Sequence, residues 1–460
     1  MPNNFITRED LPLFNNGSRF LTGAALLKDG KRDLAGTFDL FVRELPSVRN
    51  YLVFAGLEYI IEYLINFKFT DKQLAYLKKA YGLDEQTVDY YKKFKFTGDV
   101  DAMPEGTLCF AAEPIIRITA PIIEGIMTEL YTNNIIMLQT MHASKIARAV
   151  FAAKRKKFII GASSRSHGAE SAVKAVRAAE ITGANFTLTL AAMQLKINKP
   201  EGGAAPHYYI MSYPDELCAF RSYAYYFGQK MFFLIDTYKS ITGLKNFIIV
   251  AKEMEQRGKK MRGIALDSGD LYKLSVLARK MLDRADLNYV EIAAMSNLDE
   301  HKIKKLEDKK APIDIYAGAT AILNVTDAPK LEVVYKLSAL KDKNQWIPKM
   351  KLSSKKISLP GRKQVFRIEK HGQYIGDVIG LENEKIKGKK LLVPYIKNGK
   401  LVKKLPSLEG IRKYYEREKK KFKRELFAID KKVKYPVEIS AELNKMTAQT
   451  KKQIQKQFIN

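Results

Sequence analysis

Cysteine and long hydrophobic runs are both scarce in this sequence. Only two cysteines, Cys109 and Cys218, occur among 460 residues, which excludes a disulfide framework and a cysteine-rich zinc site. No run of about 18 uncharged apolar residues is present, and the first residues lack the basic and then apolar pattern of a signal peptide. These absences lead us to expect a cytoplasmic protein without a membrane partner.

Acidic residues are few relative to basic ones. The chain has 50 Asp and Glu against 79 Lys and Arg, for a formal net charge of +29. Such an excess can indicate a polyanionic partner such as nucleic acid. Lysine is spread over predicted helix faces and turns, however, and glutamate is interleaved with it near 410–428. We interpret the charge as a lysine-rich solvated surface and do not expect a nucleic-acid partner.

The order of strand and helix signals predicts three regions. An N-terminal α/β domain covers 1–150 and ends in a long helix, a β/α barrel core that carries the site covers 151–340, and a basic, mixed region covers 341–460. Within the first region, Thr70 as N-cap and Gly82 as stop signal predict a helix between them. With 46% hydrophobic residues, the chain can bury a large core.

A regular alternation fills the middle of the sequence. Short apolar runs end in small, polar or acidic residues, and each is followed by a helical stretch. The runs include 158–160, 231–235, 263–266, 290–294 and 313–316. Strand, helix and returning strand form the βαβ unit, whose strands are parallel. Polar residues placed repeatedly after buried strands are how a barrel builds an active site at one end. The sequence therefore predicts an α/β enzyme fold with a β/α barrel or partial barrel.

The segment Asp267-Ser268-Gly269-Asp270 follows a predicted strand and opens a helix. Amide groups and carboxylates at a helix N-terminus can hold phosphate, or a metal with its waters. Equally, Ser268 or Asp270 can simply cap the helix. Both interpretations stay open at this stage.

Other polar residues near strand ends carry similar alternatives. His207 could act as a nucleophile or an acid/base group, or it could be a structural histidine bonded to backbone. His167 has the same ambiguity, although Arg165 nearby offers a fork suited to carboxylate or phosphate. Asp236 could bind a sugar hydroxyl or a metal, or only a loop amide. Gly318 lies where barrels often hold phosphate.

Several stretches, taken together in this order, resemble one family over nearly the whole length. They include FTGDVDAMPEGTLCFAAEPIIRITAPIIEG, SRSHGAESAVKAVRAAEITG, HYYIMSYPDELCAF, LIDTYKSITGLKN, LDSGDLYKLS and LPGRKQVFR. The chain resembles the nicotinate phosphoribosyltransferases. The resemblance implies the type II phosphoribosyltransferase fold, an irregular α/β barrel with an N-terminal α/β domain, working as a homodimer with sites near the subunit interface.

The resemblance also implies a reaction and its participants. Nicotinate would displace pyrophosphate from phosphoribosyl pyrophosphate (PRPP) to give nicotinate mononucleotide in NAD salvage, with Mg²⁺ as cofactor. ATP would be a co-substrate, coupled through transient phosphorylation of a histidine that the match places at His207. The catalytic positions are His207 and Asp267, with no metal ligand assigned. The substrate-binding positions are Ser164, Arg165, His167, Gly168, Asp236, Ser268, Asp270, Gly318 and Thr320.

Some positions depart from the family pattern. Ser164 and Ala265 stand where arginines are usual, Gly17-Ser18 where an aromatic ring is expected, and Ala317-Gly-Ala-Thr where the phosphate loop is richer in glycine. An added Cβ can obstruct the close backbone approach that a phosphate requires. Two alternatives therefore stand beside the enzyme: a catalytically degenerate member with a binding, regulatory or structural role, and a phosphoribosyltransferase for a different base.

Overall fold

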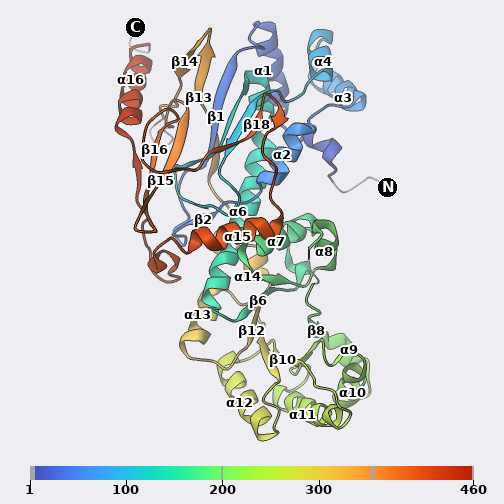
Figure 1. Cartoon of the computed structure of the whole chain (residues 1–460). Helices are drawn as coiled ribbons and strands as arrows, with labels where there is room; N and C mark the ends of the chain where they lie inside the picture. The colour runs from blue at the N-terminus through green and yellow to red at the C-terminus, as the bar shows by residue number, and fades with distance from the viewer. Residues whose placement is uncertain (1–5, 198–199, 354–357, 458–460) are drawn as a thin grey trace. The chain divides into compact units, whose positions relative to one another are not determined.

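The computed structural model describes residues 6–197, 200–353 and 358–457, shown in Figure 1. The chain forms two compact units. Unit 1 contains Met1–Met141, Lys330–Leu426 and Lys432–Asn460, and unit 2 contains His142–Pro329 and Phe427–Lys431. The sequence predicted three consecutive regions, whereas in the fold the N-terminal segment and most of the C-terminal segment share one unit.

Unit 1 is built on an antiparallel sheet whose strands come from distant parts of the chain. Their order is β14-β13-β1-β5-β3-β18-β19. The bounds are β1 (Ala35–Val42), β3 (Asp99–Ala102), β5 (Pro114–Pro121), β13 (Val333–Asp342), β14 (Gln345–Pro348), β18 (Val393–Lys397) and β19 (Lys400–Leu401). Strand β1 pairs with both β5 and β13, and β18 pairs with β3. The predicted C-terminal region thus completes the sheet of the N-terminal one.

Two smaller sheets and a set of helices complete unit 1. The sheets contain β15 (Lys363–Lys370), β16 (Gln373–Leu381), β17 (Lys389–Lys390) and β20 (Val437–Ile439), and separately β2 (Leu52–Val53) and β4 (Leu108–Cys109). The helices are η1 (Arg8–Leu13), α1 (Gly17–Lys28), α2 (Leu57–Ile65), α3 (Asp71–Tyr81), α4 (Glu85–Lys92), α5 (Ile122–Met127), α15 (Leu408–Lys419) and α16 (Ala441–Gln457). Helix α6 (Glu129–Ala152) and η3 (Arg424–Phe427) cross the division between the units.

The local signals around α3 act as predicted. The Thr70 hydroxyl accepts a hydrogen bond from the Gln73 amide, and Gly82 ends the helix at a φ of +63°, where a Cβ would be strained. The first region ends in the long helix α6, which begins at Glu129 and is preceded by the short helix α5, which ends at Met127.

Unit 2 contains a parallel sheet of seven strands in the order β7-β6-β12-β11-β10-β9-β8. Its strands are β6 (Lys157–Ile160), β7 (Asn185–Phe186), β8 (Ala204–Ala205), β9 (Phe232–Leu234), β10 (Gly263–Leu266), β11 (Glu291–Ala294) and β12 (Ile315–Gly318). Consecutive strands are neighbours in this sheet, and the last strand, β12, pairs with the first, β6. Among the described residues, β7 and β8 are the one consecutive pair that is not hydrogen-bonded, so the barrel is open between them. This arrangement is an irregular, open barrel, which confirms the predicted α/β fold class.

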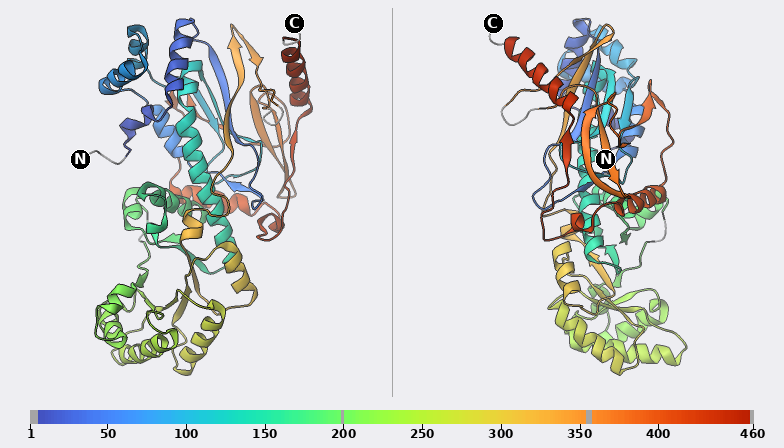
Figure 2. Two further views of the ribbon diagram at one scale, coloured as in Figure 1. Left: turned by 180° about the vertical axis from the view of Figure 1, so that it is seen from behind. Right: turned by 60° about the vertical axis from the view of Figure 1, so that its left-hand side comes forward.

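Helices separate the successive strands of the barrel. They are η2 (Ser163–Arg165), α7 (Ala169–Thr182), α8 (Thr189–Leu195), α9 (His207–Met211), α10 (Glu216–Phe227), α11 (Ser240–Gln256), α12 (Leu271–Arg284), α13 (Glu300–Asp308) and α14 (Thr320–Leu323). Figures 1 and 2 show α10, α11 and α12 on the outer side of the parallel strands. One core cluster is formed by Ile159, Phe232, Leu234, Ala265, Ala293 and Ile315. None of the helices in the described ranges is long and apolar enough to cross a membrane.

Candidate active site

The residues singled out from the sequence gather at one end of the barrel. Because its strands are parallel, their carboxyl ends share an edge, and each loop that follows a strand begins there. Gly318 is the last residue of β12, and the others lie after β6, β8, β9, β10 and β12, from Ser164 in the first loop to Thr320 in the last.

His207 lies between the loops that follow β8 and β9. It is the first residue of α9 and is half-buried. Its Nδ1 is 3.1 Å from the Oγ1 of Thr237, in the loop that follows β9. The partner of His207 is therefore a side-chain hydroxyl that can orient the ring. A purely structural histidine was expected to bond to a backbone group instead.

Asp236 connects the loops after β9 and β10. The hydroxyl of Ser268 donates a hydrogen bond to its Oδ2 at 2.5 Å. Its Oδ1 is buried and has no hydrogen-bond partner among the described residues. A buried carboxylate oxygen without a donor is costly, so this atom is suited to a hydroxyl group or a hydrated cation brought by a ligand.

Asp267 connects the loops after β10 and β11 in a similar way. Its Oδ1 accepts a hydrogen bond of 3.0 Å from the Ser296 amide. Ser296 and Asn297 have φ values of +60° and +47°, a left-handed backbone that is uncommon in residues other than glycine. Such strain concentrates at functional sites. Ser296 and Thr237 were not predicted as site residues, although each follows an apolar run of the sequence.

Asp270 has a different role from its neighbours in the same segment. It is the N-cap of α12, and its Oδ1 accepts a hydrogen bond of 3.1 Å from the Lys273 amide. This backbone hydrogen bond lowers the pKa of Asp270, with a smaller contribution from the Lys273 charge. Of the two candidates for the N-cap of α12, Asp270 is therefore the residue that caps the helix. The Ser268 hydroxyl bonds to Asp236 instead.

The loop after β6 leaves its polar groups accessible. Ser164, Arg165, His167 and Gly168 are all exposed, and the Arg165 guanidinium forms no ion pair within the described ranges. The Asn324 side chain donates a hydrogen bond of 2.8 Å to the Arg165 carbonyl, which fixes the backbone of this loop. Gly168 has a φ of +89° at the N-cap of α7, a conformation that favours glycine. An unpaired guanidinium beside this turn is suited to an anion.

Gly318 ends the last strand of the barrel, β12, and Thr320 follows it. A Cβ on Gly318 would lie 2.6 Å from Ile322 Cγ1 and 2.9 Å from Phe158 Cζ. Packing alone therefore explains this glycine. Thr320 opens the short helix α14 and is half-buried.

The described residues contain no group of three or more His, Cys, Asp or Glu side chains placed to hold a metal ion. Two separate carboxylates, Asp236 and Asp267, follow adjacent strands β9 and β10. This donor set fits Mg²⁺, which keeps several waters and is usually bound through one or two carboxylates together with substrate phosphates.

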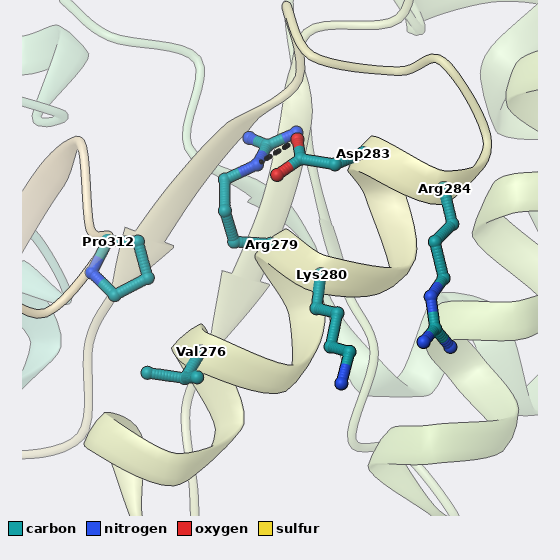
Figure 3. Close-up of a pocket in the computed structure, with 6 residues that line it drawn as sticks. All are labelled: Val276, Arg279, Lys280, Asp283, Arg284 and Pro312. Carbon is teal, nitrogen blue, oxygen red and sulfur yellow. Dashed lines mark hydrogen bonds and ion pairs between the residues drawn. The ribbon is translucent and has the colours of Figure 1, made fainter.

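Two cavities of unit 2 lie away from this edge. The one in Figure 3, about 520 Å³, is lined by Val276, Arg279, Lys280, Asp283, Arg284 and Pro312. The Arg279 guanidinium there is already bonded to the Asp283 carboxylate and to the Leu287 and Val290 carbonyls. The other, about 640 Å³, lies at the amino ends of the strands and includes Glu201, Arg262 and Glu291. Neither cavity contains a residue of the candidate site.

Comparison with known proteins places the chain in a family. The profile of the nicotinate phosphoribosyltransferase N-terminal domain matches residues 13–137, and that of the C-terminal domain matches 386–447. Nicotinate phosphoribosyltransferase pncB2 of Mycobacterium tuberculosis is 37% identical over 412 residues, covering 88% of this chain and 87% of that protein. The Bacillus subtilis nicotinate phosphoribosyltransferase is 38% identical over 370 residues, covering 79% and 75% of the two proteins.

A solved structure shares the fold. The crystal structure of human nicotinic acid phosphoribosyltransferase superimposes with a TM-score of 0.83 at 21% identity, covering 95% of this chain and 99% of that one. The identity to the two bacterial relatives, over most of each protein, is what decides membership. The chain belongs to the nicotinate phosphoribosyltransferase family.

Proposed function

We propose that this protein is a nicotinate phosphoribosyltransferase of NAD salvage. In the reaction, the ring nitrogen of nicotinate forms a bond to C1′ of PRPP while the bond from C1′ to pyrophosphate breaks. The electron pair leaves with pyrophosphate, and nicotinate mononucleotide is formed. The observation that carries the proposal is the chain of contacts His207–Thr237, Ser268–Asp236 and Asp267–Ser296, which joins the loops of four successive strands at one edge.

Each part of this edge has a chemical task in the reaction. As the bond to pyrophosphate breaks, positive charge develops on the ribose, and the carboxylates of Asp236 and Asp267 stabilise it. The accessible Arg165 and His167 would bind the phosphate groups. The two carboxylates are the described groups that would hold Mg²⁺ through its waters, and the bound ion would supply positive charge to the leaving pyrophosphate.

ATP coupling would use His207. The hydrogen bond to Thr237 holds the imidazole in one orientation at the mouth of the barrel. The imidazole can take the terminal phosphoryl group of ATP while ADP leaves, and water then removes this group from the histidine as phosphate. This role comes from the family resemblance, and the contact with Thr237 supports it because a nucleophile must be held in a fixed orientation.

We also propose a homodimer that works in the cytoplasm. Helices α9 and α10 carry exposed aromatic and apolar side chains, including Tyr208 at 77%, Met211 at 64% and Tyr226 at 68%. Exposed apolar surface of this kind is typical of an interface. Cys109 and Cys218 are free thiols, as suits a reducing compartment. Light scattering would give the mass in solution, and a monomer at micromolar concentration would contradict the dimer.

A second candidate is a family member that has lost turnover. Ala265, where the family pattern has an arginine, is completely buried in the barrel core. Ser164, at another such position, is exposed and offers only a hydroxyl. Two missing arginine contacts would remove phosphate binding unless Arg165 and lysines replace them.

One experiment separates these functions. The purified protein is incubated with nicotinate, PRPP and Mg²⁺, with and without ATP, beside the variant His207→Ala. We expect nicotinate mononucleotide from the wild type and loss of the ATP stimulation in the variant. Absence of product together with absence of thermal stabilisation by PRPP would leave the degenerate member. Product only with nicotinamide or another base would indicate a different acceptor.

A further inference from the structure

The loop that follows β11 contains a turn in a strained conformation. Ser296 and Asn297 both have a left-handed backbone, which costs energy in residues that carry a Cβ. This conformation directs the Ser296 amide to the Asp267 carboxylate, at 3.0 Å. Backbone strain persists only where the surrounding structure holds the chain in place. The contacts of this loop should therefore include one that holds the turn.

The loop is anchored on both sides of the turn. Before it, the Met295 amide donates a hydrogen bond of 2.9 Å to the Leu266 carbonyl at the end of β10. After it, Leu298 is buried, and Asp299 is the N-cap of α13, where its carboxylate accepts a hydrogen bond of 2.8 Å from the Lys302 amide. These contacts fix the ends of the loop and leave the turn between them.

The turn itself is held by a side chain of α13. The Lys302 Nζ donates a hydrogen bond of 2.9 Å to the carbonyl oxygen of Asn297. Lys302 thus holds the loop at two points, through its backbone amide at Asp299 and through its ammonium at Asn297. A hydrogen bond from a charged donor is stronger than one between neutral groups. The ammonium therefore fixes the strained turn to the first turn of the helix.

We propose that Lys302 is a positioning residue for Asp267, because its ammonium holds the turn whose Ser296 amide fixes the Asp267 carboxylate. The proposal rests on the proposed function in that Asp267 is taken to stabilise positive charge on the ribose. A carboxylate that is held through one oxygen presents the other in one direction, so less reorganisation is needed as the charge develops. Lys302 acts through the loop and does not touch the substrate.

Two substitutions of Lys302 and one control isolate this contact. Lys302→Met keeps the length of the side chain and removes the donor, whereas Lys302→Arg restores a charged donor. The cap at Asp299 is kept in both, because it uses only the backbone amide of residue 302. The matched control is Lys305→Met, at an exposed lysine of the same helix. Circular dichroism and thermal melting first establish that each variant folds.

The first readout needs no substrate. Hydrogen exchange of the Ser296 amide is measured by mass spectrometry on overlapping peptides that end on either side of this residue. We expect Lys302→Met to raise the exchange rate about fivefold, because the turn that directs the amide to Asp267 has lost one hydrogen bond. Lys302→Arg and Lys305→Met should exchange at nearly the wild-type rate.

The second readout is steady-state kinetics with nicotinate, PRPP and Mg²⁺. We expect Lys302→Met to lower kcat about fivefold with little change in KM for PRPP, because the contact supports a group that acts in the transition state. Lys302→Arg should recover most of the loss, and Lys305→Met should match the wild type.

The outcomes are distinct. An unchanged exchange rate in Lys302→Met, or an equal change in Lys305→Met, would overturn the proposal. A higher KM for PRPP with unchanged kcat and exchange would show that Lys302 binds phosphate directly, which also overturns it. If exchange responds as expected but the wild type makes no product, Lys302 still positions Asp267 and the proposed function fails.

Discussion

The two ends of the parallel sheet in unit 2 use charged residues in opposite ways. At the amino end, Glu201 accepts from Lys157, Asn185 and Arg262, and Arg262 also pairs with Glu291 and lies over the Phe232 ring. At the carboxyl end, Asp236 has one hydroxyl partner and one unused oxygen. Charges that satisfy each other stabilise a fold, whereas charges left open are available to a ligand.

Glu201 also explains how the open barrel is held together. Strands β7 and β8 do not pair in the described part of the chain, and Glu201 precedes β8. Its amide donates to the Phe186 carbonyl of β7 at 2.8 Å, and its carboxylate reaches residues beside β6, β7 and β10. Burial raises the pKa of Glu201, but the hydrogen bonds from Lys157 and Arg262 outweigh it and leave the pKa lowered. One side chain thus bridges the gap.

The largest effect is expected from removing an open charge at the carboxyl end. Asp236→Asn should lower kcat/KM roughly 100- to 1000-fold, because a carboxylate that stabilises developing positive charge is lost. The melting temperature should stay within about 2 °C, since the amide can still accept from Ser268. Steady-state kinetics and thermal melting measure the two quantities.

The matched control is Glu253→Gln, a half-buried carboxylate paired with Arg221 away from the site. It should change neither quantity. Equal losses of activity in both variants would show that the assay responds to charge in general and that Asp236 is not special.

The opposite result is expected at the amino end. Glu201→Gln should lower the free energy of unfolding by about 1 to 3 kcal/mol, because three partners lose a largely buried charge. The activity of the folded fraction should be unchanged. Urea unfolding measures the first quantity. The exposed pair partner Glu409→Gln is the control and should cost at most about 0.5 kcal/mol.

A finer substitution tests the contact that orients His207. Thr237→Val removes the hydroxyl and keeps the shape, and should lower activity about tenfold, the effect of one hydrogen bond. Thr237→Ser restores the hydroxyl and should recover most of it. A valine variant as active as wild type would show that the imidazole needs no partner.

The smallest effect concerns pH. The pKa of His142 lies below its ordinary 6.5 because of burial, so between these values the unfolded chain binds a proton that the folded chain does not. Stability is therefore lost as pH falls below about 6.5. The melting temperature of wild type should fall more steeply with acid than that of His142→Gln. His371→Gln, at an exposed histidine, should leave the slope unchanged, and identical slopes in all three proteins would exclude this role of His142.

The sequence predicted the features that depend on neighbouring residues. Alternating strands and helices were enough to predict a parallel barrel and to place polar residues at its carboxyl end. The cap at Thr70 and the stop at Gly82 are set by a few adjacent residues. The sequence left open whether Asp270 caps the helix or binds a ligand. The hydrogen bond from the Lys273 amide, seen only in the structure, shows that it caps the helix.

Features that depend on residues far apart could not be predicted in this way. Thr237 is recognisable only once β8 and β9 are adjacent and His207 is beside it. His142 lies in the predicted long helix at the end of the first region, and its contact is with Leu323, much later in the chain. The pairing of β18 with β3 also joins distant segments. Periodicity reports which face is buried but not which partner covers it.

The pairing of β1 with β13 has a consequence for synthesis. Val42 faces Val333, so a ribosome must deliver nearly all of unit 2 before β1 acquires this neighbour. Unit 2, whose strands pair with their neighbours in the chain except where β6 pairs with β12, can fold first, before the edge of β1 acquires its partner β13. In a nascent chain that ends between β1 and β13, one edge of β1 would be unpaired and its mostly apolar side chains would be exposed. We expect chaperones that bind such edges to bind β1 at this stage.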